Sequence, residues 1–285
     1  GQIIPPSIVL VLLGSVLNRP VGDLFKAALV PGFLLVSIYV IYIIVIALIR
    51  PNAAPAMPPE EIKAFKSKGF IGRLIRAFIM PMILIVAVLG SIFAGWATPT
   101  QAAGVGAMGA TILTVVEGKF NLPVLKRVMR ETTHLTCMVF IILLGATTFS
   151  FVFREMNGDV YLSDLVRNAN LSPMLFLLLV MIVVFIAGFF IDFIEIIFII
   201  VPVIAPIFQQ MGVDLVWIGI LLALNLQTSF LTPPFGFSLF YLKGVAPPGI
   251  TTQHLYRGIV PFVIIQVIFL LLIILFPELA MGFVG

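Results

Sequence analysis

Long apolar runs separated by short charged segments dominate the sequence. A helix needs about 20 mostly apolar residues to cross the hydrocarbon core of a bilayer. Runs that suit such a crossing cover residues 27–49, 77–95, 99–116, 135–153 and 258–277. Two further stretches do not fit one simple crossing, because residues 173–211 are too long and residues 215–242 are interrupted by Thr232, Pro233 and Pro234. The pattern predicts a protein built from membrane helices.

The basic residues orient these segments. All but four of the 16 Lys and Arg residues lie in three loops, residues 50–76, 117–131 and 243–257. Positive residues concentrate on the cytoplasmic side of membrane proteins, so we expect all three loops to face the cytoplasm. Within them, residues 59–76 and 119–131 mix basic and apolar positions at helical spacing. This mixture is typical of interfacial amphipathic helices, but ordinary cytoplasmic loops fit it equally well.

This orientation predicts a re-entrant hairpin. Segment 135–153 ends on the outer side, and segment 215–242 has to end on the inner side. Residues 173–211 therefore enter and leave by the outer face, with a turn near Gly188–Asp192. Irregular backbone at that depth is tolerated only where it is buried in protein or lines a cavity.

Composition narrows the class further. Apolar residues make up 61% of the chain and charged residues 10%, and the mean hydropathy is +1.24. These values exclude a disordered chain and a soluble enzyme. The net charge of +4 gives no basic groove for a nucleic acid. Cys137 is the only cysteine, and His134 and His254 form no HExxH pair, so neither a disulfide framework nor a multi-cysteine or HExxH metal site is expected. The fold class is an all-α polytopic membrane protein.

Two stretches resemble each other in opposite orientation. Pro5–Pro6 precede an apolar span that opens at Val30–Pro31, and Pro233–Pro234 precede one that opens at Val260–Pro261 after a similar interval. Chance similarity between apolar, proline-containing segments is the alternative. By the loop charges the first copy runs outward and the second runs inward. Inverted repeats with broken helices in matching positions indicate a secondary transporter.

Two carboxylates fall inside the membrane, at the predicted hairpin turn. Asp192 and Glu195 are three residues apart and share one face of a helix. An intramembrane carboxylate is costly and is a functional hypothesis by default. It could bind a cation or a proton, or it could be a protonated or hydrogen-bonded group that locks the hairpin to a neighbour. Function is the favoured interpretation for Asp192, and both remain open for Glu195.

The interrupted segment 215–242 carries a second polar group. Its candidate residues are Asn225, Gln227, Thr228, Ser229, Thr232, Pro233, Pro234 and Gly236. Prolines free backbone carbonyls one turn upstream, and the side chains supply neutral oxygens of the kind that bind Na⁺ in transporters. A proline kink whose hydroxyls bond back to the helix is the alternative. Ser7, after Pro5 and Pro6, is a weaker first copy, and Thr98 is readily explained as a helix N-cap before Pro99.

Four motifs resemble one known family. They are GQIIPPS at 1–7, ATPTQAAGVGA at 97–107, GFFIDFIEIIFIIVPVIAPI at 188–207 and NLQTSFLTPPFGFSLFYLKG at 225–244. In order and spacing they resemble the large membrane (M, DctM-like) subunit of the tripartite ATP-independent periplasmic (TRAP) transporters, over essentially the whole chain.

The resemblance implies a function. It implies an inverted-repeat, elevator-type secondary transporter, similar to the ion transporter superfamily, with a re-entrant hairpin and broken helices. The chain is then no enzyme but the membrane subunit of an importer of organic acids such as C4-dicarboxylates. Na⁺ is the coupling ion, and no other cofactor is expected. The implied partners are a periplasmic substrate-binding protein and a small four-span membrane subunit, with the protein in the bacterial inner membrane and no nucleic acid bound.

The resemblance also assigns residues. It makes Gly188 and Asp192 the tip of the second hairpin and places Na⁺ near Gly188, Thr228, Ser229 and Thr232. Asn225, Gln227, Pro233, Pro234 and Gly236 complete the unwound segment, and Pro5, Pro6 and Ser7 form the break of the first repeat. The first hairpin is expected to precede residue 1. Gln101 stands where an acidic residue is common in the family.

The expected organisation follows from these assignments. It comprises a broken helix of the first transport repeat (1–17), scaffold helices with an amphipathic cytoplasmic loop (18–95, loop 50–76), helices leading into the second repeat (96–153), the hairpin (173–211), the second broken helix (215–242) and a C-terminal scaffold helix (258–281).

Three other functions suit a membrane protein of this composition to different degrees. The nearest is an ion-coupled organic-anion transporter of similar architecture that needs no binding protein. An intramembrane aspartyl protease needs carboxylates on two separate helices, whereas Asp192 and Glu195 share one segment. A passive channel is a further alternative.

Overall fold

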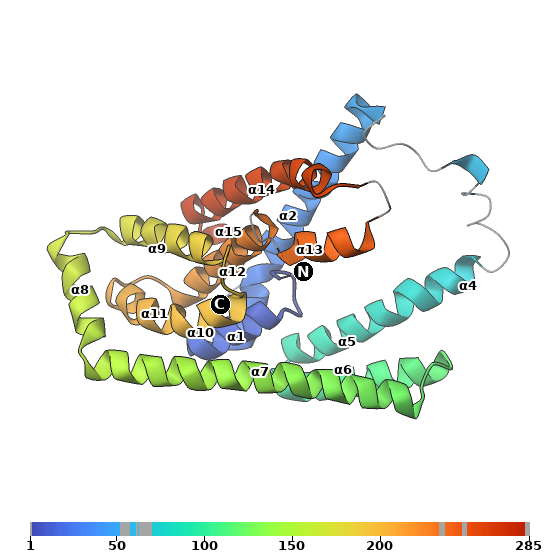
Figure 1. The fold of residues 1–285 in the computed structure, drawn as a ribbon, viewed down its shortest axis with the longest axis horizontal. Coiled ribbons are helices and arrows are strands. Elements are labelled where there is room, and N and C mark those ends of the chain that lie inside the picture. The colour runs from blue at the N-terminus through green and yellow to red at the C-terminus, as the bar shows by residue number, and fades with distance from the viewer. Residues whose placement is uncertain are drawn as a thin grey trace. The chain divides into compact units, whose positions relative to one another are not determined.

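The computed structural model describes residues 2–51, 58–60, 62, 70–233, 237–246 and 250–282 (Figure 1). All regular secondary structure in these residues is helical, which confirms the all-α prediction. Four of the described helices are long and apolar enough to cross a membrane, or five if one bent pair counts as a single span. The chain divides into a larger unit, residues 1–37 with 135–285, and a smaller unit, residues 38–134.

Two helices cross the boundary between the units, α2 (Val21–Ile49) and α7 (Leu122–Glu155). The smaller unit also holds α4 (Phe70–Leu74), a π-helical turn η2 (Ile75–Ile79), α5 (Met80–Phe93) and α6 (Pro99–Val116). The larger unit also holds α1 (Ile8–Val16), α8 (Gly158–Asn168), α9 (Pro173–Ala187), α10 (Phe193–Ile199), α11 (Val201–Gln210), α12 (Leu215–Leu231), α13 (Phe237–Val245), α14 (Thr252–Leu275) and α15 (Glu278–Met281).

In the smaller unit, α5 and α6 form a tight helical pair. Thr98 caps α6 through a capping box with Gln101, which confirms the N-cap interpretation of Thr98. A Cβ added at Gly109 of α6 would lie 2.3 Å from Cδ1 of Leu84 on α5. Small residues of this kind allow helix backbones to approach closely.

In the larger unit, α12 is the most completely buried helix. Leu24 and Leu17 pack directly on Gly219 of α12. A Cβ added at Gly219 would lie 2.6 Å and 3.1 Å from their methyl carbons. On another face, the Trp217 indole Nε1–H donates a hydrogen bond of 3.3 Å to the carbonyl of Ile273 on α14. The end of α1, the start of α2 and α14 therefore surround the first half of α12.

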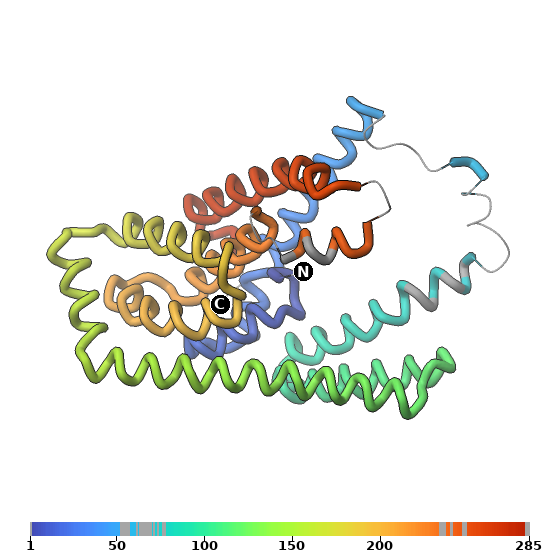
Figure 2. The backbone as a smooth tube through the Cα atoms, viewed as in Figure 1, coloured from blue at the N-terminus to red at the C-terminus, as the bar shows by residue number. Residues whose placement is uncertain are grey.

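Helices α9, α10 and α11 form a helical hairpin, which Figure 2 traces as a continuous tube. The rings of Phe176 on α9 and Phe208 on α11 pack against each other at a tilt of 51°, with their centroids 4.9 Å apart. The residue midway between them in the chain is Asp192. The non-helical turn covers Gly188–Asp192. Helix α10 begins directly after it, and the returning arm bends by 49° between α10 and α11.

Helix α7 differs from the two separate segments, 119–131 and 135–153, that the charge pattern suggested. It runs without interruption from Leu122 to Glu155. The residues between the two segments, 132–134, include no glycine or proline, so no residue there breaks the helix. Asn157, in a left-handed conformation with φ 57°, then turns the chain into the amphipathic helix α8.

Candidate ion and substrate site

The turn of the hairpin lies directly against the end of α12. A Cβ built on Gly188 would lie 2.2 Å from Oγ and 2.6 Å from Cβ of Ser229. Ser229 is completely buried. The structure thus brings together the two predicted elements, Gly188 in the hairpin turn and Ser229 in the interrupted helix. Only a residue without a side chain fits at position 188 against Ser229.

One turn away, a buried hydrogen bond joins the same two helices. The amide Nδ2 of Asn225 donates to the carbonyl of Met181 on α9 over 2.7 Å, and Asn225 is 2% exposed. Asn225, one of the predicted site residues, therefore has a structural role, because its hydrogen bond holds α9 to α12. Leaving such a buried group unpaired costs about 1–3 kcal/mol.

The hydroxyls near the end of α12 all point back along their own helix. Thr228 donates to the carbonyl of Leu224 over 2.7 Å, Ser229 to Leu226 over 2.9 Å, and Thr232 to Thr228 over 2.8 Å. These hydrogen bonds are the ones expected for a proline kink whose hydroxyls bond back to the helix, the alternative to an ion site. A hydroxyl that donates its one hydrogen still keeps acceptor lone pairs, so the arrangement also leaves oxygens for a cation.

Helix α12 ends at Leu231, with Thr232 as its C-cap in an extended conformation. The next helix, α13, begins at Phe237, so the helix is broken where the sequence predicts. Pro233 is partly buried, whereas Pro234 and Gly236 lie outside the described residues. The C-terminal end of a helix carries a partial negative charge, which favours a cation near Thr232.

Asp192 is the N-cap of α10. Its Oδ1 accepts a hydrogen bond of 2.8 Å from the backbone N–H of Phe193. The ring of Phe193 packs against Phe230 of α12 with the centroids 5.6 Å apart, so the start of α10 also lies beside the end of α12. Further along α10, Oε2 of Glu195 is buried and has no hydrogen-bond partner within the described part of the chain.

Ser7 is the N-cap of α1, where its Oγ accepts from the N–H of Leu10 over 3.3 Å and its hydroxyl donates to the carbonyl of Gln2. Pro5 and Pro6 precede it outside the helix. At the other end of α1, Leu17 packs on Gly219 of α12.

Two glutamines, Gln227 on α12 and Gln266 on α14, have buried polar atoms without a hydrogen-bond partner among the described residues. These atoms are Oε1 of Gln227, a predicted site residue, and both Oε1 and Nε2 of Gln266. Gln266 is 1% exposed. The sequence reading missed Gln266, although a lone glutamine inside the apolar run 258–277 was a visible signal.

A cation at this site would depend on neutral oxygens. Among the residues that the structure describes, no group of three or more His, Cys, Asp or Glu side chains could hold a metal ion. Hydroxyl, amide and carbonyl oxygens with at most one carboxylate suit a hard monovalent cation better than a transition metal.

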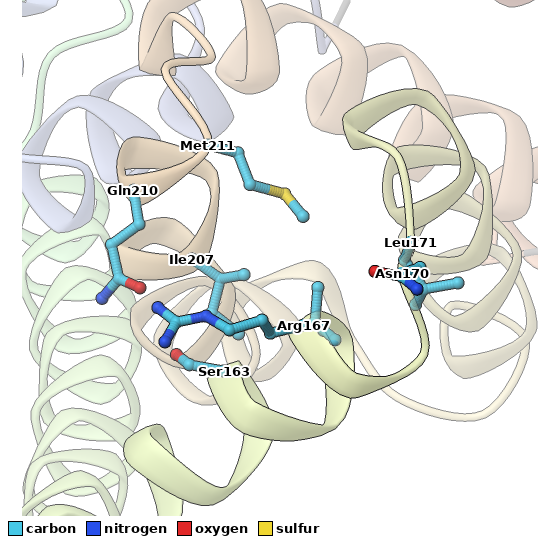
Figure 3. A pocket seen from close by; sticks show the side chains of 8 residues that line it. Ser163, Arg167, Asn170, Leu171, Ile207, Gln210 and Met211 are labelled. Atoms are coloured by element: carbon cyan, nitrogen blue, oxygen red, sulfur yellow. The ribbon is translucent and has the colours of Figure 1, made fainter.

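A separate pocket of about 330 Å³ lies at the other end of the hairpin. Figure 3 shows Ser163 and Arg167 of α8 on one side, Gln210 and Met211 at the end of α11 on another, and Asn170 beside the start of α9. The residues that precede the hairpin and its last residues therefore line one pocket. None of the predicted site residues lines it.

These features define a multi-pass helical membrane protein in which a helical hairpin packs against a broken helix. Such an architecture is typical of secondary transporters. The chain belongs to the DctM component family of the tripartite ATP-independent periplasmic transporters, whose family model matches residues 1–279. This confirms the resemblance found in the four sequence motifs and makes the protein a TRAP transporter membrane subunit.

Curated relatives cover nearly the whole chain. The C4-dicarboxylate TRAP transporter large permease protein DctM of Pseudomonas aeruginosa is 32% identical over 99% of this chain and 64% of its own length. The sialic acid TRAP transporter large permease protein SiaM of Vibrio cholerae is 29% identical over 98% of this chain and 63% of its own length. The ectoine TRAP transporter large permease protein TeaC of Halomonas elongata is 28% identical over 98% of this chain and 63% of its own length. The chain thus spans a little under two thirds of these relatives.

Proposed function

We propose that the protein is the membrane subunit of a Na⁺-coupled, binding-protein-dependent secondary importer of organic acids. The observation that carries this proposal is the contact of Gly188 with Ser229, which places the hairpin turn against the end of a broken helix. Transporters bind ions and substrate where helices are broken inside the membrane. Family membership supports the transport function, and the Gly188–Ser229 contact supports the assigned position of the site.

Na⁺ binds, on this proposal, between the Gly188–Asp192 turn and the oxygens of Thr228, Ser229 and Thr232. The hydroxyl lone pairs and the partial negative charge at the end of α12 both favour a cation. Binding there would draw the turn and α12 together. Na⁺ would shift the population from an open to a closed hairpin only as far as it binds the closed state more tightly than the open one.

The substrate is an organic acid. The relatives named above carry C4-dicarboxylates, sialic acid and ectoine according to their names, and each of these compounds contains at least one carboxylate. The first backbone N–H groups of α1 follow Ser7, the predicted break of the first repeat. A helix N-terminus of this kind stabilises an anion, so a carboxylate of the substrate would bind there.

The tripartite family implies the remaining assignments. A periplasmic substrate-binding protein delivers the acid, a small membrane subunit assembles with this chain, and the complex resides in the bacterial inner membrane. Transport follows an elevator movement in which the hairpin and α12 shift as one body. The hydrogen bond between Asn225 and Met181 supports this grouping, because it holds α9 to α12.

The test is uptake by the complete transporter in proteoliposomes. Radiolabelled succinate, sialic acid and ectoine are supplied with the binding protein, under an inward Na⁺ gradient or with K⁺ in place of Na⁺. Thr232→Ala should raise the Na⁺ concentration for half-maximal uptake by about 10-fold, because one hydroxyl–ion contact is lost. Thr232→Ser keeps the hydroxyl and should therefore show the wild-type Na⁺ concentration. Thr148→Ala is the matched control, since Thr148 bonds back to Leu144 over the same 2.8 Å but lies on α7.

Two results would contradict the proposal. Equal uptake with Na⁺ and K⁺ would exclude Na⁺ coupling, and an unchanged Na⁺ requirement in Thr232→Ala would exclude the assigned site. Uptake of the same rate and affinity without the binding protein would favour the alternative, an ion-coupled carrier that works alone.

A further inference from the structure

A groove runs along the second half of α7, apart from the Gly188–Ser229 contact. Two neighbouring pockets, of about 350 Å³ and 490 Å³, share the lining residues Val16, Ser150, Arg154 and Pro202. These four residues come from α1, α7 and α11. We call the combined space the α7 groove. All of its lining residues belong to the larger unit.

The α7 groove leads from an end of the larger unit toward its middle. At one end it is lined by Asn18, Gln209 and Leu215, which mark where α1 and α11 end and α12 begins. All of these points lie on the outer side in the topology that the loop charges predict. At the other end it reaches Leu143, about 16 Å along α7 from Arg154 at 1.5 Å per residue. That distance is about half of a bilayer core.

Ser150 is the unusual side chain in the α7 groove. It is 7% exposed, and its Oγ is buried without a hydrogen-bond partner among the residues that the structure describes. Thr147 and Thr148, on the same helix, both donate to carbonyls one turn back. Such back-bonding is the usual way for a hydroxyl in an apolar helix to be satisfied. An unsatisfied buried hydroxyl is costly, so the Ser150 hydroxyl is suited to bind a polar ligand in the α7 groove.

Arg154 lies one helical turn after Ser150 and therefore on the same face of α7. It lines both halves of the α7 groove and is the one basic residue among the lining residues. Within the part of the chain that the structure describes, its side chain forms no hydrogen bond or ion pair. A guanidinium presents paired N–H donors that match a carboxylate.

Two acids also line the α7 groove, and neither is paired with Arg154. Asp159 is half-buried in the first turn of α8, where the helix N-terminus favours a negative charge. Glu155 is the exposed last residue of α7. Their charges oppose an anion in the groove, so removing the charge of Asp159, the more buried of the two, is expected to strengthen anion binding.

We propose that the α7 groove is a capture site for a carboxylate of the transported acid, bound by the guanidinium of Arg154 and the hydroxyl of Ser150 before the acid reaches the Gly188–Ser229 region. This inference rests on the proposed function. It assigns to Arg154 the role of recognising the carboxylate, and it makes Ser150 the second donor.

Binding to the purified complete transporter is the first measurement, by calorimetry with succinate, sialic acid and ectoine as separate probes. Arg154→Gln should weaken binding of the best probe by about 10-fold or more, because a charge-assisted hydrogen bond is lost. Ser150→Ala should weaken it by about 3-fold, and Arg154→Lys should restore part of the loss. Asp159→Asn should act in the opposite direction and strengthen binding. Arg167→Gln is the matched control, since Arg167 lines the separate pocket beside α8.

Uptake in proteoliposomes is the second measurement. Arg154→Gln should raise KM in proportion to its loss of affinity, with kcat changed less than 2-fold at equal protein content. Unchanged affinity in both Arg154→Gln and Ser150→Ala, or no binding of any of the three acids, overturns the α7 groove as a carboxylate site. Loss of co-purifying phosphatidylglycerol in Arg154→Gln at unchanged acid affinity likewise overturns it and identifies a lipid site. Failure of the wild type to take up any of the acids under a Na⁺ gradient, with binding intact, contradicts the proposed function instead.

Discussion

Replacing Gly188 by alanine tests the central contact of the candidate site. The new Cβ would lie 2.2 Å from Oγ of Ser229 and 2.6 Å from its Cβ. Rotation of the Ser229 side chain can remove Oγ but not Cβ, so the backbones themselves have to separate. Carbon atoms pack at about 3.5–4.0 Å, which requires a shift of about 1 Å. Overpacking of this kind costs about 1–3 kcal/mol.

The assay separates stability from ion binding. Thermal unfolding of the purified transporter should show a lower Tm for Gly188→Ala, and the Na⁺ concentration for half-maximal uptake should rise because the turn is displaced from α12. Adding Ser229→Gly removes both clashing atoms and should recover most of the Tm, although one predicted ion ligand is lost. Gly90→Ala is the control, since nothing lies within 4 Å of a Cβ at Gly90. Wild-type Tm and Na⁺ dependence in Gly188→Ala would refute the contact.

Three further predictions concern other parts of the structure. Asn225→Leu should lower the free energy of unfolding by about 1–3 kcal/mol in a denaturant titration, because the Met181 carbonyl loses its buried donor; a change below about 0.5 kcal/mol would show that the bond is unimportant. Gly109→Ala should leave Tm nearly unchanged, since the nearest atom is the mobile end of Leu84, and a large drop would indicate a rigid contact. Thr98→Ala should cost about 1 kcal/mol through loss of the α6 cap, measured in the same titration, and an unaffected protein would argue against that capping box.

The helices and the hairpin turn were predictable because both follow from local patterns. Apolar runs of sufficient length give helices, and the positive-inside rule required residues 173–211 to return to the side they came from. The turn at Gly188–Asp192 then fell in the middle of that run. The same reasoning divided α7 into two segments, because the charged residues suggested that the membrane interface lies between them. No residue at that point breaks the helix.

The side-chain partners were not predictable in the same way. The sequence indicated that Thr228, Ser229 and Thr232 carry oxygens, but only the packing shows that each hydroxyl bonds back to its helix and that Ser229 meets Gly188. The α7 groove is formed by residues of three helices that are far apart in the chain. Ser150 lies in an apolar run and Arg154 near its end, so neither stood out before the helices were brought together.

The contact between Gly188 and Ser229 also predicts that these two positions covary among homologues. The two positions share one volume, so they cannot enlarge independently. Among relatives, a residue larger than glycine at the first position should occur only with a smaller residue at the second, and a bulky second residue should always be paired with glycine. A set of aligned homologues should therefore show these two columns varying together, although they are 41 positions apart in the chain.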